Sequence, residues 1–200
     1  MVKLLPEEAW QKYLFEAAKS PGWMEDSKDI SKDMPMSKRE LFGLILLAHI
    51  RNHLSKSKDW IVGYDSNASE PNDGLVSNGT ERIDIEHKLI HQMTNQAALD
   101  AILSTYEKYS QKGEAYGSGR ELIIFANKAT KGVVKISSLR DQIKNECPFD
   151  RVLLIHAVAM RENNTVAIIH VTEHYPGKGI AQVDLNLLSG KASVPHCELI

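Results

Sequence analysis

The chain has 200 residues, of which 42% are hydrophobic and 25% are charged, and its formal net charge at pH 7 is −2. This is the composition of an ordinary soluble domain with a sizeable core, and the charge argues against a highly basic nucleic-acid coat while allowing a local basic groove. With only Cys147 and Cys197, a disulfide framework and a cysteine-rich zinc site are both disfavoured.

The first residues and the longest apolar run predict a cytoplasmic protein without membrane contact. The start, Met-Val-Lys-Leu-Leu-Pro-Glu-Glu, lacks the apolar core of a signal peptide. The longest apolar run, residues 41–50, is interrupted by Gly43 and His49 and is too short to span a bilayer.

Two helices are predicted in the first 55 residues. Apolar residues recur at helical spacing over residues 7–19, and a polar connector follows over residues 25–36. Ser37-Lys38-Arg39-Glu40 fits a capping box, which opens a helix to about Ser55 that is apolar nearly all round and should be deeply packed. We expect residues 1–36 to form an N-terminal helical extension and residues 37–200 to form one α/β domain.

Strands and helices alternate after residue 55. The pattern predicts a strand at 59–64, a hairpin at 73–90, a helix at 94–111, a strand at 121–126, a short helix from Ser138, strands at 152–159 and 166–171, and an edge strand at 180–188. This order predicts a mixed central β-sheet flanked by helices, in the α/β or α+β class.

The hairpin carries the most informative residues. Asn78-Gly79 between two β-compatible runs is a strong hairpin signal, and a two-residue turn there places Ser77 opposite Thr80 and Asp73 opposite Asp84. Because directly opposed residues share a face and side chains alternate along a strand, the residues expected on one face are Asp73, Asp84, Glu86 and Lys88.

Carboxylates at these separations suit a hard cation. Two of them can share Mg²⁺, which binds a few carboxylate oxygens and keeps several waters, and a bound metal lowers the pKa of its water and stabilises charge on a phosphoryl group. Lys88 offsets part of the negative charge and reaches the zone where that water would attack phosphorus. The face therefore predicts a metal site with a catalytic lysine.

Asp73, followed by Glu86-His87-Lys88 on the second strand of a hairpin, resembles the PD-(D/E)XK nuclease superfamily, the restriction-endonuclease-like fold. The tripeptide before the hairpin is Pro71-Asn72-Asp73 rather than Pro-Asp. The family core runs helix, three strands, helix, strand, and residues 37–126 follow that order. The resemblance covers somewhat under half of the chain.

The resemblance implies a metal-dependent endonuclease that hydrolyses phosphodiester bonds of DNA without a covalent intermediate. Asp73 and Glu86 would hold Mg²⁺ or Mn²⁺, and Lys88 would position or activate the attacking water. RNA stays open as a substrate. Cutting both strands with a single-site subunit would require a homodimer.

Three further residues are candidates for supporting roles. Glu40 matches the place where some members of the resembled family carry an additional metal ligand, although its part in the capping box explains it without metal. Asp84 is an alternative or outer ligand. Gln92, before the third helix, would orient the lysine or contact a phosphate, or is simply a polar residue at a helix entry.

Other interpretations stay open for the same residues. Acidic and basic residues that alternate along a strand are often only its solvated face. The chain would then be a non-catalytic nucleic-acid or protein-binding module of the same fold, or a plain α/β interaction subunit. A set of basic residues either lines a phosphate-backbone groove or solubilises loops: Arg120, Lys128, Lys131, Lys135 and Arg140.

The histidines show no complete metal motif. His49 and His53 have the spacing for a shared ligand on a helix, but no third ligand is identifiable near them. His156, His170 and His174 lie in predicted strand segments without an associated motif, and we expect structural or surface roles for them. His87 is expected to point away from the carboxylate face.

Overall fold

A nine-stranded mixed β-sheet dominates the computed structural model, which describes residues 2–5, 12, 29–31, 34–65, 74–91, 94–110, 119–126, 141–142, 147, 149–163, 165–186, 188–189 and 191–199. The strands lie in the order β1-β4-β5-β6-β7-β8-β9-β10-β11. Their bounds are β1 Val2–Leu5, β4 Ile61–Asp65, β5 Gly74–Ser77, β6 Arg82–Ile90, β7 Arg120–Ala126, β8 Arg151–Arg161, β9 Val166–Tyr175, β10 Gly179–Asn186 and β11 Ala192–Cys197.

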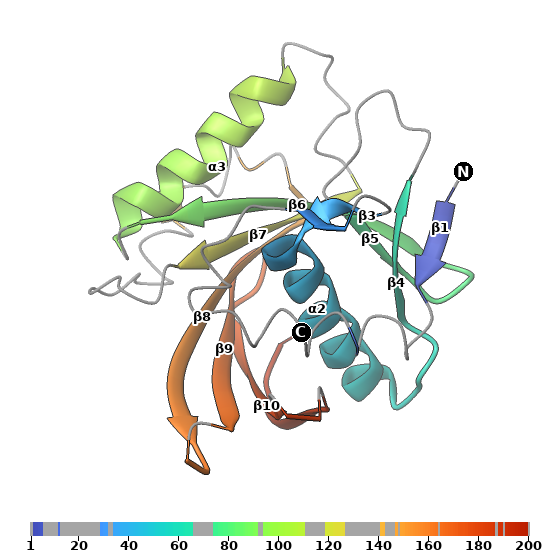
Figure 1. Ribbon diagram of the computed structural model, residues 1–200. Helices are drawn as coiled ribbons and strands as arrows, with labels where there is room; N and C mark the ends of the chain where they lie inside the picture. The colour runs from blue at the N-terminus through green and yellow to red at the C-terminus, as the bar shows by residue number, and fades with distance from the viewer. Residues whose placement is uncertain are drawn as a thin grey trace.

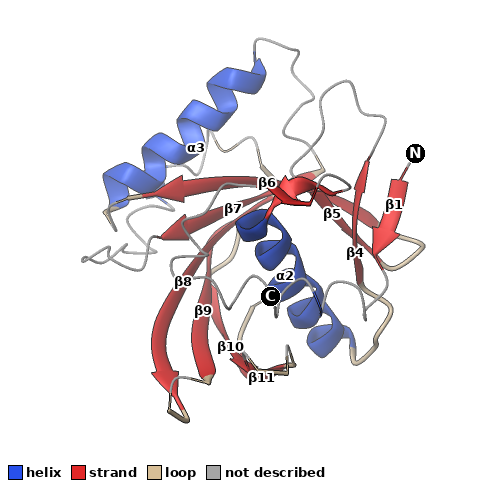
Figure 2. Ribbon diagram, viewed as in Figure 1, coloured by secondary structure: helices blue, strands red, loops and turns tan. Residues whose placement is uncertain are grey.

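Strands β6, β7 and β8 run parallel, and the other neighbouring pairs are antiparallel. A parallel pair needs a crossover connection, and helix α3 (Asn95–Ser110) supplies it between β6 and β7. The sheet curls around the other long helix, α2 (Lys38–Ser55), so that α2 lies inside the curve and α3 lies on the outer face (Figures 1 and 2). The predicted class, a mixed sheet flanked by helices, is confirmed, with more strand than helix.

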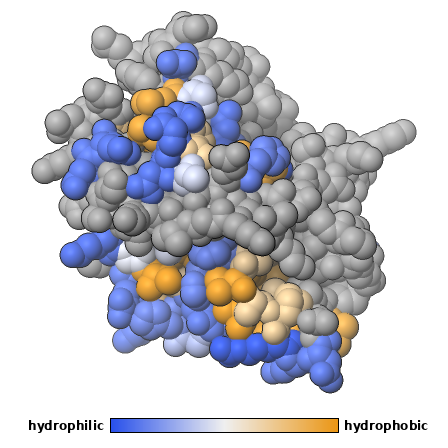
Figure 3. All heavy atoms as spheres, turned by 90° about the vertical axis from the view of Figure 1, so that its left-hand side faces the viewer, coloured by the Kyte–Doolittle hydropathy of each residue, from blue (hydrophilic) through white to orange (hydrophobic). Residues whose placement is uncertain are grey.

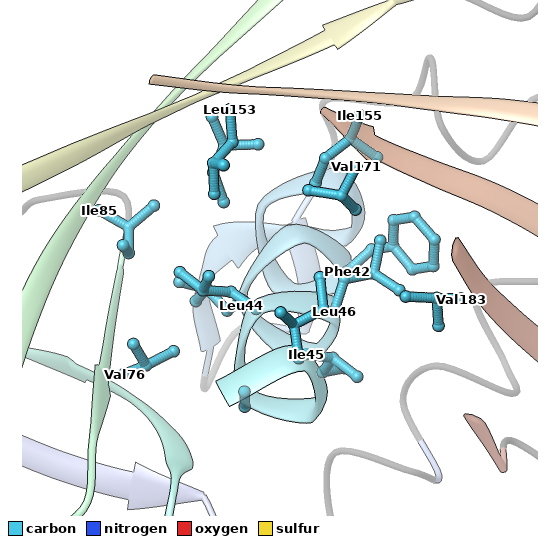
Figure 4. Packing of buried hydrophobic residues seen from close by; sticks show 14 of the residues in the cluster. Phe42, Leu44, Ile45, Leu46, Val76, Ile85, Leu153, Ile155, Val171 and Val183 are labelled. Atoms are coloured by element: carbon cyan, nitrogen blue, oxygen red, sulfur yellow. The ribbon is translucent and has the colours of Figure 1, made fainter. Parts of the chain in front are cut away.

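Helix α2 is the centre of the larger core. Its residues from Leu41 to Ala48 are all buried, as expected for a helix that is apolar on every side. Residues from strands β4 to β10 surround it, as Figure 4 shows for Val76, Ile85, Leu153 and Val183. The apolar run that is too short for a membrane is therefore the helix around which the sheet folds.

Gly43 lets α2 approach the middle of the sheet closely. A Cβ atom on Gly43 would lie 2.7 Å from Cζ of Phe125 and 2.8 Å from Nε2 of His87. Both side chains belong to the inner face of the sheet, on β7 and β6. The helix therefore packs at this point through its backbone.

A smaller core lies between the outer face and α3. It includes Ala98, Ala101 and Ile102 of α3, together with Leu122 and Ile124 of β7. The central strands are thus covered on both faces, which explains why β7 is almost entirely buried. This outer layer is also the side on which Glu86 lies, since Glu86 is opposite Leu122 in the parallel register.

Several predicted elements need correction. The predicted edge strand at 180–188 is β10, which is internal, because β11 pairs with it and forms the edge. The predicted connector at 25–36 contains a small hairpin of β2 (Asp29–Ser31) and β3 (Met34–Ser37). Residues 2–5 add strand β1 to the main sheet. The predicted helix at 7–19 lies outside the described residues, apart from residue 12.

Within the described part of the chain, neither helix has the length and apolar character required to cross a membrane.

Candidate functional site

Strands β5 and β6 form the predicted hairpin, but their register differs from the prediction. Ser77 pairs with Arg82 and Leu75 pairs with Asp84, so the connecting loop spans residues 78–81 and the predicted pairing of Asp84 with Asp73 is wrong. The shift amounts to two residues, and side chains alternate with a period of two. A shift of two residues leaves each side chain on its predicted face, so Asp84, Glu86 and Lys88, which alternate along β6, share one face as predicted.

The side chain of Asn78 explains the wider loop. Its Oδ1 accepts hydrogen bonds from the backbone N–H groups of Thr80 (3.1 Å) and Glu81 (2.8 Å), and the Ser77 hydroxyl donates to the Glu81 carbonyl (2.7 Å). Such side-chain bonds compete with ladder hydrogen bonds. They close a longer turn than the Asn-Gly dipeptide alone predicts.

Glu86 is a buried carboxylate with a cationic neighbour. Its side chain is 2% exposed, and its Oε1 lies 2.8 Å from Nη1 of Arg120. Arg120 is the first residue of β7, opposite Asp84 in the parallel register, so its guanidinium reaches diagonally along β6 to Glu86. The burial of Glu86 and this short ion pair make it an internal charge rather than part of a solvated strand face.

Lys88 follows Glu86 on the same face. It is half-buried and lies opposite Ile124, and two residues along a strand separate its Cα from that of Glu86 by about 7 Å. The two side chains leave the sheet beside the apolar layer under α3. The predicted carboxylate and ammonium on one face of β6 are thus present.

Asp84 forms an ion pair with Arg82 of the same strand. Nε of Arg82 lies 2.7 Å from its Oδ1, and the side chains of Arg82 and Asp84 are 41% and 23% exposed. This is an ion pair between alternate residues of one strand near the surface, which contributes little to stability. The described ion-pair partner of Asp84 is therefore Arg82, at the start of β6.

The other candidate ligands do not join Glu86 in the described residues. Glu40 lies in the first turn of α2, and α2 packs against the inner face of the sheet whereas Glu86 belongs to the outer face. Asp73 and Gln92 lie outside the described residues, as do Lys128, Lys131, Lys135 and Arg140.

The described residues alone do not complete a metal site. No group of three or more His, Cys, Asp or Glu side chains converges to hold a cation in the described part of the chain. The oxygen donor set of Glu86 suits Mg²⁺, but Arg120 already provides positive charge at its Oε1. A cation that bound there would compete with the guanidinium.

His87 points away from Glu86, as predicted. Its ring stacks on Phe125 with 5.6 Å between the ring centroids, on the inner face beside Gly43. Burial and, to a smaller extent, the charge of Arg39 lower its pKa to about 3. The ring is therefore neutral at pH 7 and serves packing.

We expect the protein to lose stability as the pH falls below 6.5, because of His87 and His174. Burial lowers the pKa of His174 to about 4. Between the unfolded value of 6.5 and these folded values, only the unfolded chain binds the protons, so each histidine removes roughly 2 kcal/mol of the free energy of unfolding by pH 5. Urea unfolding at a series of pH values measures this loss.

The variant His174→Gln isolates one of these contributions. Its free energy of unfolding should depend less on pH between 6.5 and 5, by roughly 2 kcal/mol, whatever its stability at pH 7. Glu121 acts in the opposite direction, because burial raises its pKa against the opposing charges of Arg51 and Arg151. An unchanged pH slope in His174→Gln would show that His174 is not a buried neutral ring.

The sequence analysis did not predict the cluster of buried charged residues near the starts of β7 and β8. Arg51 of α2 binds Glu121 of β7, and Arg151 of β8 lies 3.0 Å from Glu173 of β9. A pocket of about 320 Å³ opens beside it. In the sequence, each of these residues is a single charge near the end of an apolar run. Sequence spacing alone does not show which of these charges lie close together in the fold.

Comparison of the chain with protein-family models, with curated proteins and with solved structures finds no match.

Proposed function

We propose that the chain is a metal-dependent nuclease of the PD-(D/E)XK type that hydrolyses phosphodiester bonds of DNA. The observation that carries this proposal is the pair Glu86 and Lys88, two residues apart on one face of β6 in a hairpin with β5. Gly74, at the start of β5, pairs with Ile85. Asp73 precedes Gly74 in the sequence and is the second proposed metal ligand, although it lies outside the described residues.

The order of elements supports the same proposal. Residues 38–126 run α2, β4, β5, β6, α3, β7, which is the helix, three strands, helix, strand order of the resembled family. The first strands are antiparallel, and the strand after the second helix is parallel to β6. A chance Glu-X-Lys sequence would not require these surroundings.

The proposed roles follow from the chemistry of each side chain. Glu86 and Asp73 would hold Mg²⁺ or Mn²⁺, which supplies an acidified water and stabilises charge on the phosphoryl group. Lys88 would orient the water or hold the phosphate, because its ammonium leaves the same face beside Glu86. Arg120 would move from Oε1 of Glu86 to the substrate phosphate, for which its guanidinium is suited.

One observation favours a second function, a non-catalytic nucleic-acid or protein-binding module. In the described conformation, Arg120 and the 2% exposed Glu86 form an internal ion pair, which is how a structural charge is usually satisfied in a protein. On this alternative Arg120 never leaves Glu86, and the protein binds its partner without cutting it.

Plasmid cleavage decides between the two functions. Supercoiled DNA, and separately a single-stranded RNA, are incubated with the protein in Mg²⁺, Mn²⁺ or EDTA, beside Glu86→Gln and the control Glu81→Gln. We expect nicking with Mg²⁺ or Mn²⁺ only, and a loss of about 100-fold or more in Glu86→Gln, since a metal ligand contributes several kcal/mol to the transition state. Glu81 is an exposed loop residue, so its variant should cut at the rate of the parent.

Cleavage that survives in Glu86→Gln, with circular dichroism like that of the parent, would remove Glu86 from the site. DNA binding in a gel-shift assay, without cleavage under any metal condition, would favour the binding module.

A further inference from the structure

Three histidines and a glutamine form a row across the last four strands of the sheet. His156 of β8 pairs with His170 of β9, His170 pairs with Gln182 of β10, and Gln182 pairs with His196 of β11. Directly paired residues share a face of the sheet. The residues next to the row in the chain, Ile155, Val171 and Val183, belong to the inner core. Because side chains alternate along a strand, the row lies on the outer face.

The row lies on a part of the outer face that α3 does not cover. Helix α3 contacts β6 and β7, whereas the row is carried by β8 to β11. Figure 3 views the left-hand side of Figure 1, where α3 lies in the upper half and β8 in the lower half, and its lower part shows hydrophilic residues with hydrophobic ones between them. His156 and His170 are half-buried, so part of each side chain faces solvent.

The rings of His156 and His170 are close enough to share one ion. Their centroids are 5.7 Å apart and their planes meet at 84°. Two imidazoles that bind one tetrahedral Zn²⁺ through Zn–N bonds of 2.0–2.1 Å have centroids about 5 Å apart. A small rotation of either side chain would therefore bring both rings onto one cation.

Gln182 prepares His170 to act as a ligand. The Nε2 of Gln182 donates a hydrogen bond of 2.7 Å to Oδ1 of Asp184, which turns the amide oxygen toward the other side. Gln182 is directly paired with His170, so its amide lies on the same face beside that ring. An amide oxygen that accepts one ring N–H would leave the second ring nitrogen with its lone pair, the arrangement typical of histidines that bind metals.

His156 offers a nitrogen that the described structure leaves unsatisfied. Its Nδ1 is buried and has no hydrogen-bond partner among the described residues. Metals bind the neutral form of imidazole through a nitrogen lone pair.

We propose that His156 and His170 bind one late first-row divalent cation, of the class of Zn²⁺, Ni²⁺ and Cu²⁺, on the outer face of β8 and β9. Neutral imidazole selects these ions over Mg²⁺ and Ca²⁺, so the site is independent of the proposed nuclease centre. No third His, Cys, Asp or Glu converges on it in the described part of the chain, and water completes the coordination. Gln182 is a positioning residue that acts through His170.

Calorimetric titration with Zn²⁺ near neutral pH, in the presence of excess Mg²⁺, tests the proposal. We expect one Zn²⁺ per chain, and a rise in Kd of about tenfold or more in His156→Gln, in His170→Gln and in Gln182→Leu. The matched control is His53→Gln, because His49 and His53 are the other spaced pair and lie on α2. Its Kd should equal that of the parent.

Paramagnetic broadening on the parent protein gives a second readout that needs no variant. Substoichiometric Cu²⁺ should broaden the ring resonances of His156 and His170 before those of His53. Absence of Zn²⁺ binding by the parent, a Kd unchanged in folded His156→Gln and His170→Gln, or loss of binding in His53→Gln would each overturn the proposal. DNA cleavage with Mg²⁺ should persist in His170→Gln, so failure of this site and failure of the nuclease proposal are distinguishable.

Discussion

Lys88→Met is expected to lower the rate of Mg²⁺-dependent DNA cleavage by about 100-fold or more while leaving the fold intact. Positioning or activating a nucleophile is commonly worth 10²–10⁴-fold, so about 100-fold is the low end for this role. Methionine keeps the length and the apolar stem of lysine, and Lys88 is only half-buried, so the lost charge is the main change. Single-turnover cleavage of a labelled duplex measures the rate.

Lys191→Met is the matched control for that experiment. Lys191 is exposed in the turn between β10 and β11, where its backbone carbonyl accepts a hydrogen bond from the N–H of Asn186 and its backbone N–H donates to the hydroxyl of Ser189. It loses the same charge far along the sheet from β6, so its rate should remain that of the parent. A Lys88→Met protein that still cuts within about threefold of the parent would show that Lys88 has no part in the chemistry.

Arg151→Met is expected to lower the free energy of unfolding by about 3–5 kcal/mol, because it leaves a buried carboxylate without its counter-charge. Glu173 is fully buried, with its Oε1 3.0 Å from Nε of Arg151, and neither of its oxygens accepts a hydrogen bond from the described residues. Gly177 lies directly against the carboxylate, since a Cβ there would be 3.1 Å from Cδ of Glu173. Urea unfolding of the variant and the parent gives the difference.

The double variant Arg151→Met with Glu173→Gln distinguishes the cost of the stranded charge from the cost of lost packing. Stability should recover by about half or more in the double variant, because an amide is less costly to bury than a carboxylate. Arg161→Met is the comparison at the surface, since Arg161 is 61% exposed and 3.9 Å from Asp184; exposed pairs contribute less than about 1 kcal/mol. A similar small change in Arg151→Met would mean that water reaches Glu173.

Local patterns in the sequence predicted α2, α3 and the strands from β4 to β10, but missed β1, β2, β3 and β11 and predicted the relations between distant elements poorly. The apolar run after Ser37 predicted the first and last residues of α2 to within one residue. Alternation along β6 correctly placed Glu86 and Lys88 on one face of the sheet and His87 on the other. The hairpin register failed because the Asn78 side chain replaces ladder hydrogen bonds, an interaction that the Asn-Gly pattern does not encode.

The partner of Glu86 was beyond the reach of sequence patterns. Arg120 is 34 residues away, and it meets Glu86 only because α3 returns the chain parallel to β6 in one particular register. Strand β11 was missed because Pro195 and His196 interrupt the apolar pattern, as they do at many sheet edges. The candidate site was thus predicted on one strand and not across strands.

The position of α2 inside the curled sheet has a consequence for biosynthesis. This helix is complete at Ser55, but the strands that cover its far side, β8 to β10, begin only at Arg151. At a synthesis rate of 5–20 residues per second, the apolar helix waits roughly 5–20 s for that cover. A nascent chain therefore exposes this apolar helix before the strands that bury its far side have been made.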